Sequence, residues 1–272
     1  MLILDREKLF RLGAELRDTY ASAEPFPHVV IDDFLREEDL REVAGSFPGP
    51  KEVEWHEFDN PRQKKLAVED EAQIEGNALW LLYQLNSATF MQFLESLTGI
   101  EGLIPDPYFT GGGLHQIERG GYLKVHADFN RHPKFRLDRR LNLLLYLNEN
   151  WKEEYGGHLE LWDKEMRRCV RRILPTFNRC VIFSTTDSSY HGHPEPLACP
   201  KGVTRKSLAL YYYSNGRPAV ENSEEHGTLV RPRPGETIHG LNGRTAVGSL
   251  KSVLRRFVPP IVADVRARLR RK

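Results

Sequence analysis

Residues 106–215 consist of short apolar segments separated by turn residues, and this alternation constrains the fold more than any other feature of the sequence. Glycine pairs at residues 120–121 and 156–157, and the dipeptide Pro175-Thr176, stand between segments at points where the chain can reverse. Many short strands at regular spacing, each ended by a turn, indicate a β-sandwich or a β-barrel. The predicted strands cover residues 114–118, 122–127, 141–147, 158–162, 169–174, 179–184 and 207–213.

The first 105 residues differ, because apolar residues at helical spacing are prominent there. This spacing predicts a helix over residues 5–21 and a helical pair over residues 74–98, in which Ser87 caps the second helix. Residues 28–31 have the composition of a short strand, and the segment after them predicts a helix that ends near residue 44.

We expect the whole chain, residues 1–272, to form a single α+β domain. In it, residues 1–105 would be a mixed, largely helical N-terminal support and residues 106–215 the β core. Residues 216–272 turn polar and rich in glycine and proline, and we expect them to form a C-terminal annex with a helix-like segment around residues 253–269.

Composition argues against several classes of protein. With 40% hydrophobic and 28% charged residues, the chain is ordinary for a soluble globular protein. Its net charge of +1 gives no general attraction to nucleic acid or to a membrane, so neither is an expected partner. The 3 cysteines lack CxxC spacing, which argues against a disulfide scaffold and favours a reducing compartment. The sequence has no signal-peptide core and no membrane-spanning run, so we expect a cytoplasmic protein, and its oligomeric state stays open.

His126 and Asp128 are the first candidate metal ligands. They are two residues apart in a predicted strand, so their side chains project from the same face of the sheet. One imidazole and one carboxylate make up two thirds of a facial triad for non-haem iron(II). The same triplet arises often by chance, and a surface histidine beside a turn aspartate is the plain alternative.

The third ligand is expected on a distant strand, because a barrel brings far segments together. His191 and His193 follow the apolar strand at residues 179–184, and only the local backbone decides which of the two faces a metal. Arg205 begins the last core segment, where an inward-pointing arginine needs an anion and its planar fork suits a carboxylate. Taken alone, Arg205 is better explained as a strand-end arginine in solvent.

The ordered pattern of HxD, a strand-rich interval, His and Arg resembles the iron(II)/2-oxoglutarate-dependent oxygenases, and among them the prolyl 4-hydroxylase-like branch. The similarity runs from about residue 114 to residue 213. It includes four further motifs: Gly-Gly-Tyr before HxD, Tyr-Leu-Asn followed by Trp, Gly-Gly-x-Leu, and Pro-x-Phe-Asn-Arg. These motifs begin at Gly120, Tyr146, Gly156 and Pro175.

The resemblance implies a double-stranded β-helix, which is a jelly-roll or cupin-like core, with N-terminal and flanking helices. It implies that His126, Asp128 and His191 are the iron ligands. It favours His191 over His193, because the segment from His191 to Glu195 fits the register of the family's distal histidine motif.

The resemblance also implies which residues bind the cosubstrate. Arg205 matches the arginine that binds the distal carboxylate of 2-oxoglutarate, and Tyr146 matches a tyrosine that shares this carboxylate. Asn142 precedes Tyr146 by four residues and Tyr122 precedes His126 by four, so we expect both to face the same pocket. A role in lining the barrel explains Tyr146, Asn142 and Tyr122 equally well.

The implied reaction is the hydroxylation of an unactivated C–H bond in a small molecule or a peptidyl, including prolyl, substrate. Iron(II), 2-oxoglutarate and O2 would be required, succinate and CO2 would be coproducts, and ascorbate is a further expected cofactor. Asp128 favours hydroxylation over halogenation, because related halogenases lack that carboxylate, whereas desaturation and ring closure stay open.

Candidate substrate contacts are the basic loop at residues 130–136, together with His193, Trp151 and Trp162. The basic loop would suit an anionic substrate, and a solvated loop explains it equally well. The alternative functions are a zinc hydrolase on a cupin-like barrel and a non-catalytic binding module. Arg205 argues against the first, and the complete set of ligands argues against the second.

Overall fold

The computed structural model describes residues 3–238, which lie in the compact unit Met1–His239. The α-helices are α1 (Arg6–Glu15), α2 (Arg17–Ala21), α3 (Glu37–Gly45), α4 (Gly76–Leu85) and α5 (Ala88–Thr98), and 3-10 turns cover Glu71–Gln73, Glu153–Tyr155 and Ala219–Glu221. The strands are β1 (His28–Ile31), β2 (His56–Asn60), β3 (Gln63–Val68), β4 (Ile104–Pro105), β5 (Gly113–Ile117), β6 (Tyr122–Ala127), β7 (Asp138–Tyr146), β8 (Leu159–Trp162), β9 (Cys169–Ile173), β10 (Cys180–Ser184), β11 (His191–His193), β12 (Arg205–Ser214) and β13 (Leu229–Val230).

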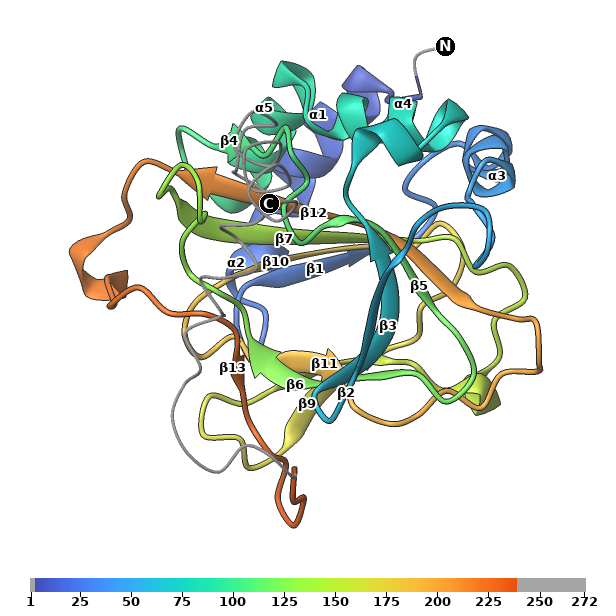
Figure 1. The fold of residues 1–272 in the computed structure, drawn as a ribbon. Coiled ribbons are helices and arrows are strands. Elements are labelled where there is room, and N and C mark those ends of the chain that lie inside the picture. The colour runs from blue at the N-terminus through green and yellow to red at the C-terminus, as the bar shows by residue number, and fades with distance from the viewer. Residues whose placement is uncertain (1–2, 239–272) are drawn as a thin grey trace, which may run out of the picture. The chain divides into compact units, whose positions relative to one another are not determined.

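The strands form one 13-stranded antiparallel sheet in the order β1-β10-β7-β12-β5-β3-β6-β11-β8-β9, with β13 beside β6, β2 beside β3 and β4 beside β12. The sheet curls, so that β6, β11 and β9 lie across an interior from β7, β10 and β1 (Figure 1). β3 and β5 connect the two layers. This curled sheet confirms the predicted double-stranded β-helix.

The helices cover the outer face of the β7–β10–β12 layer (Figure 1). Strand alternation divides the side chains of β7 between two environments. Leu141, Leu143 and Leu145 belong to the main hydrophobic core beneath the helices, whereas Asn142 and Tyr146 point to the interior of the curl. One face of the strand therefore stabilises the fold, and the other contributes to the site.

All seven predicted core strands are present, each within about three residues of its expected ends. The helical pair is confirmed, and the Ser87 hydroxyl accepts the amide hydrogen of Phe90 as the predicted cap. The helix expected over residues 5–21 is two helices that meet at Leu16.

The prediction missed the β2–β3 hairpin, and β3 shows that the first 105 residues help to close the sheet. The proposed division of the chain at residues 105 and 215 stays a prediction, and the segment at residues 253–269 lies outside the described residues.

Candidate metal centre

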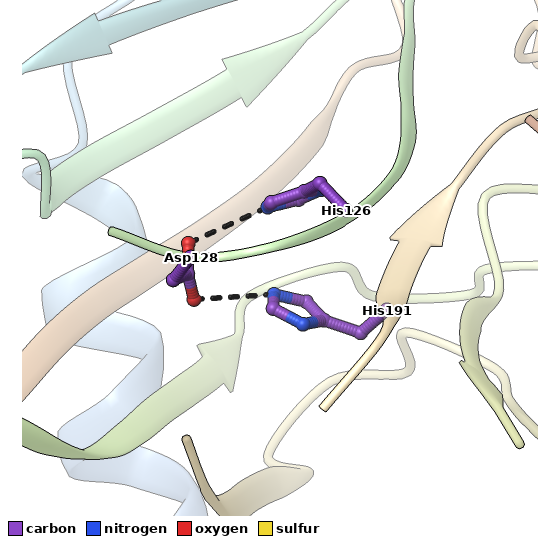
Figure 2. Close-up of side chains that lie close together, drawn as sticks. All are labelled: His126, Asp128 and His191. Carbon is purple, nitrogen blue, oxygen red and sulfur yellow. Dashed lines mark ion pairs between the residues drawn. The ribbon is translucent and has the colours of Figure 1, made fainter. Parts of the chain in front are cut away.

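His126, Asp128 and His191 lie together on the inner face of the sheet (Figure 2). His126 is near the end of β6, Asp128 follows that strand, and His191 begins β11. β6 and β11 are paired so that His191 stands directly opposite His126, with their ring centroids 4.5 Å apart. One potential ligand atom from each of the three residues lies within 4.8 Å of the others.

Backbone carbonyls orient both imidazole rings. Nδ1 of His126 donates to the oxygen of Lys124 at 2.8 Å, and Nδ1 of His191 donates to the oxygen of Ser189 at 2.9 Å. Because a carbonyl only accepts, each Nδ1 carries the hydrogen, and each neutral ring has its lone pair on Nε2. The two Nε2 atoms each lie 3.5 Å from an oxygen of Asp128. Acceptor atoms therefore face one another, an arrangement that a bound cation would stabilise.

Asp128 is held by two further side chains. Arg139 donates from Nη2 to Oδ2 of Asp128 at 3.0 Å, and Asn142 donates from Nδ2 to the same oxygen at 2.7 Å. The guanidinium of Arg139 lies against the rings of Phe129 and Tyr211, 4.4 Å and 3.4 Å from their centroids. Burial tends to raise the pKa of Asp128, but the charge of Arg139 and the neighbouring histidines hold that pKa well below its ordinary value. The carboxylate is therefore ionised and ready to bind a cation.

Arg139 was not predicted from the sequence, because it stands in a charged segment at the start of β7 with no motif to distinguish it. Asn142 does face the interior as expected, but its amide contacts Asp128 and Arg139.

Arg205 is buried in the same interior, with 4% of its surface exposed. Its Nε donates to the oxygen of Gly157 at 2.9 Å and its Nη2 to the hydroxyl of Tyr146 at 3.3 Å. Burial lowers its pKa, which the contact with Tyr146 partly offsets. Among the described residues no carboxylate forms an ion pair with Arg205. A buried guanidinium without a counter-charge is costly, so the site fits an anionic ligand.

Gly157 leaves room for this arginine. Its φ of +72° favours glycine, and a Cβ at this position would lie 3.0 Å from Cδ of Arg205 and 2.6 Å from a methyl group of Leu197.

His193 does not join the three-residue cluster. It stands opposite Leu123 on β6, and β6 has an irregular register between this pair and the pair His191–His126. The side chain of His193 is 3% exposed, and neither ring nitrogen has a hydrogen-bond partner among the described residues.

The same irregularity corrects the expectation for Tyr122. Between the two pairs His191–His126 and His193–Leu123, β6 advances by three residues while β11 advances by two. Tyr122 therefore does not lie on the face of β6 that carries His126. Its hydroxyl donates to the backbone oxygen of Asn60, at the β2–β3 turn.

The candidate substrate contacts are largely occupied in other ways. Trp151 and Trp162 are buried, and their indole nitrogens donate to the oxygen of Gly156 and the carboxylate of Glu160. In the loop at residues 130–136, His132 is buried against Asp106. A role for these residues in binding a substrate stays a prediction.

Two imidazoles and one carboxylate on one side of a metal leave its other positions open, which is the arrangement of non-haem iron(II) oxygenases. Here these three side chains and a buried arginine without a counter-ion in the described part of the chain share the interior of a double-stranded β-helix. This combination is typical of the non-haem iron oxygenases. Residues 112–213 match the family described as the 2OG-Fe(II) oxygenase superfamily. This match supports a 2OG-Fe(II) oxygenase domain in this part of the chain, and that family uses iron(II), 2-oxoglutarate and O2.

The individual proteins that this chain is similar to include prolyl hydroxylases. A mouse protein named prolyl 3-hydroxylase OGFOD1 is 26% identical over 194 residues, which cover 70% of this chain and 33% of the mouse protein. The chain thus spans about a third of the length of that curated relative.

Solved structures support the fold. A prolyl hydroxylase from Trichoplax adhaerens, solved with a hypoxia inducible factor peptide, has a TM-score of 0.55 and 19% identity, covering 80% of this chain and 96% of that one. A Pseudomonas putida prolyl-4-hydroxylase has a TM-score of 0.51 and 18% identity, covering 75% of this chain and 100% of that one.

Proposed function

We propose that this chain is an iron(II)- and 2-oxoglutarate-dependent dioxygenase that hydroxylates an unactivated C–H bond of a small-molecule or peptidyl substrate, with succinate and CO2 as coproducts. The proposed iron ligands are His126, Asp128 and His191. Arg205 and Tyr146 would bind the distal carboxylate of 2-oxoglutarate. The proposal rests on one observation: the three candidate metal ligands and Arg205, a buried arginine with no ion-pair partner among the described residues, face the same interior of the sheet.

Bound iron would supply oxygen activation, coupled to oxidative decarboxylation of 2-oxoglutarate. The protein's own part is positioning and shielding. The carbonyls of Lys124 and Ser189 fix the two imidazoles, and Arg139 and Asn142 fix the carboxylate. The ring of Phe183 packs edge-on against His191 at 4.7 Å, so this side of the site is apolar.

Two observations favour this proposal over its alternatives. A zinc hydrolase could use the same three ligands, but it has no need of a buried arginine that lacks a counter-anion. A halogenase needs an open position where Asp128 stands, so hydroxylation is the favoured outcome, with desaturation and ring closure of the same type of substrate as variants of it.

The test is succinate formation from 2-oxoglutarate by the full chain, with iron(II) and O2 or with zinc(II). We expect turnover with iron only, including slow turnover without a primary substrate. Asp128→Ala should abolish it, whereas Asp59→Ala should not, because Asp59 is exposed and pairs with Lys64 on the β2–β3 hairpin. Equal turnover with zinc, or full activity of the Asp128 variant, would refute the proposal.

Prolyl residues are one proposed substrate class, supported by the name of the mouse relative. We also propose a cytoplasmic location, which rests on 3 cysteines that are all free. No helix among residues 3–238 is long and apolar enough to cross a membrane. Ascorbate as a further cofactor is a proposal that the same succinate assay tests, by its addition and omission.

A further inference from the structure

Three polar side chains outside the candidate iron site face the same interior. They come from three strands: Lys65 from β3, His115 from β5 and His193 from β11. On β3, Leu66 packs against the main hydrophobic core beneath the helices. Its neighbours Lys65 and Ala67 therefore face the interior of the curled sheet. Ala67 is paired with His115, which places that imidazole on the inner face too.

The two histidines have unmet hydrogen-bonding capacity. Both nitrogens of His193 and Nε2 of His115 are buried without a hydrogen-bond partner among the described residues. The side chains are 3% and 8% exposed. Unpartnered buried polar atoms are uncommon in folded proteins, so a cluster of them indicates a bound group.

Lys65 adds a positive charge to this cluster. The residue is partly exposed, yet it forms no hydrogen bond or ion pair within residues 3–238, and its ammonium lies 5.3 Å from the ring centroid of Phe58. Burial lowers the pKa of Lys65 to about 8, with Asp128 acting in the opposite direction. Burial lowers the pKa values of His115 and His193, and the charge of Lys65 adds to this effect. The ammonium is therefore within electrostatic reach of both imidazoles and of the iron site, and mostly protonated at neutral pH.

The charges of the interior leave Lys65 unmatched. Arg139 is paired with Asp128, and in the proposed function Arg205 takes the distal carboxylate of 2-oxoglutarate. Glu69 raises the pKa of Lys65 less than Asp128 does, and one of its carboxylate oxygens accepts the amide hydrogen of Gly111. A cation that faces the same interior as unpartnered imidazoles is suited to one more anion, and a carboxylate matches both features.

We propose that Lys65, His193 and His115 form a second carboxylate-binding subsite inside the barrel, in addition to the one at Arg205 and Tyr146. This inference rests on the proposed function. The carboxylate has two sources: the 1-carboxylate of 2-oxoglutarate, or an acidic group on the primary substrate. Lys65 supplies the charge, and His193 supplies an N–H donor.

The experiment measures equilibrium binding to the full chain loaded with zinc(II), so that no turnover occurs. The first arm compares the dissociation constant of 2-oxoglutarate for the wild type, Lys65→Met, Lys65→Arg and His193→Val. The second arm saturates each protein with 2-oxoglutarate and compares N-acetyl-L-proline with its amide, which lacks the charge. Lys64→Met is the matched control, because Lys64 is exposed, lies on the other face of β3 and pairs with Asp59.

If the 1-carboxylate occupies the subsite, Lys65→Met weakens 2-oxoglutarate binding about 10-fold or more, and Lys65→Arg largely restores it. If a substrate acid occupies it, 2-oxoglutarate binding is unchanged, and the wild-type preference for the acid over the amide is lost in Lys65→Met. His193→Val should give a smaller loss in the same arm.

The inference is overturned if Lys65→Met changes neither quantity, including the case in which the wild type shows no preference between acid and amide. A wild type that binds no 2-oxoglutarate at all refutes the proposed function instead.

Discussion

Individual hydrogen-bond donors and acceptors determine how each candidate ligand is held. Each histidine ring is oriented by one backbone carbonyl, which any residue at positions 124 and 189 would supply. Asp128 depends on side chains, because both of its supporting donors come from Arg139 and Asn142 on β7. A substitution on β7 should therefore disturb the carboxylate of Asp128 without disturbing the two imidazoles.

Arg139→Met should lower the affinity for iron(II) or zinc(II) about 10- to 100-fold, the usual effect of removing a partner that orients a metal ligand. The carboxylate of Asp128 would lose its buried ion pair and its fixed orientation. Competition with a chromogenic chelator measures the affinity. Arg136→Met is the control, because Arg136 is exposed and 3.6 Å from Glu225. An unchanged affinity in Arg139→Met would show that Asn142 alone is sufficient.

The pH dependence of the metal-free protein should reflect His191. Burial lowers its pKa from 6.5 to about 4 in the folded state. Between these values the unfolded chain binds more protons, so stability falls as the pH falls through this window. His191 alone should contribute a loss of about 2 kcal/mol by pH 5. Burial of His115 and His193 acts in the same direction.

Urea unfolding in the presence of a chelator at pH 7.5 and pH 5 measures this loss, and His191→Asn should reduce it. Equal stability of the wild type at both pH values would contradict the assigned burial of these histidines.

At the scale of elements, the sequence predicts strands whose apolar residues are continuous, and it misses those whose faces are mixed. β10 and β12 are buried on both faces and were predicted. β2 is largely exposed and β3 is mostly half-buried, and polar or charged residues interrupt the apolar pattern of both, although β3 closes the sheet and carries Lys65. The three-residue β11 is too short for a pattern, and the irregularity of β6 that moves Tyr122 depends on pairing between distant segments. The HxD motif is visible in the local sequence, but the side chains that hold Asp128 come from β7 and are brought to it only by the fold.

Gly192→Ala tests the pairing of β11 with β6. A Cβ at residue 192 would lie 2.8 Å from the oxygen of Leu123 and 2.9 Å from that of Lys124, both backbone atoms that cannot move aside cheaply. We expect a loss of about 1–3 kcal/mol in stability, as in other overpacked sites, and weaker metal binding, because His191 shifts with its strand. Chemical denaturation and chelator competition measure the two effects.

Gly227→Ala is the control for this variant, because nothing lies within 4 Å of the Cβ it would add. A Gly192 variant with wild-type stability and metal affinity would mean that the two strands tolerate separation without moving His191.

At the scale of the whole molecule, charged side chains gather inside the curled sheet, and the main apolar core lies outside it. The main core lies between the helices and the β7–β10–β12 layer, while Lys65, Arg139 and Arg205 face inward with Asp128. Buried charges that lack partners destabilise a folded protein. These unpaired charges therefore lower the free energy of unfolding of the ligand-free molecule, and binding of an anionic ligand should raise it.

Arg205→Met tests this relation. Methionine fills similar space without a charge, so the metal-free variant should be at least as stable as the wild type, since only the bonds to Gly157 and Tyr146 are lost. In the metal-loaded wild type, 2-oxoglutarate at 100 times its dissociation constant should add about 2.7 kcal/mol, which raises Tm by about 5–10 °C in a chain of this size. The variant should lose most of this shift but keep the shift caused by metal alone, because the three ligands are intact.

Thermal unfolding with metal, and with metal plus 2-oxoglutarate, separates these two shifts, and Arg62→Met on the exposed hairpin is the control. If Arg205→Met still responds to 2-oxoglutarate like the wild type, the cosubstrate is bound elsewhere. If it unfolds far more easily without ligand, Arg205 is a structural residue.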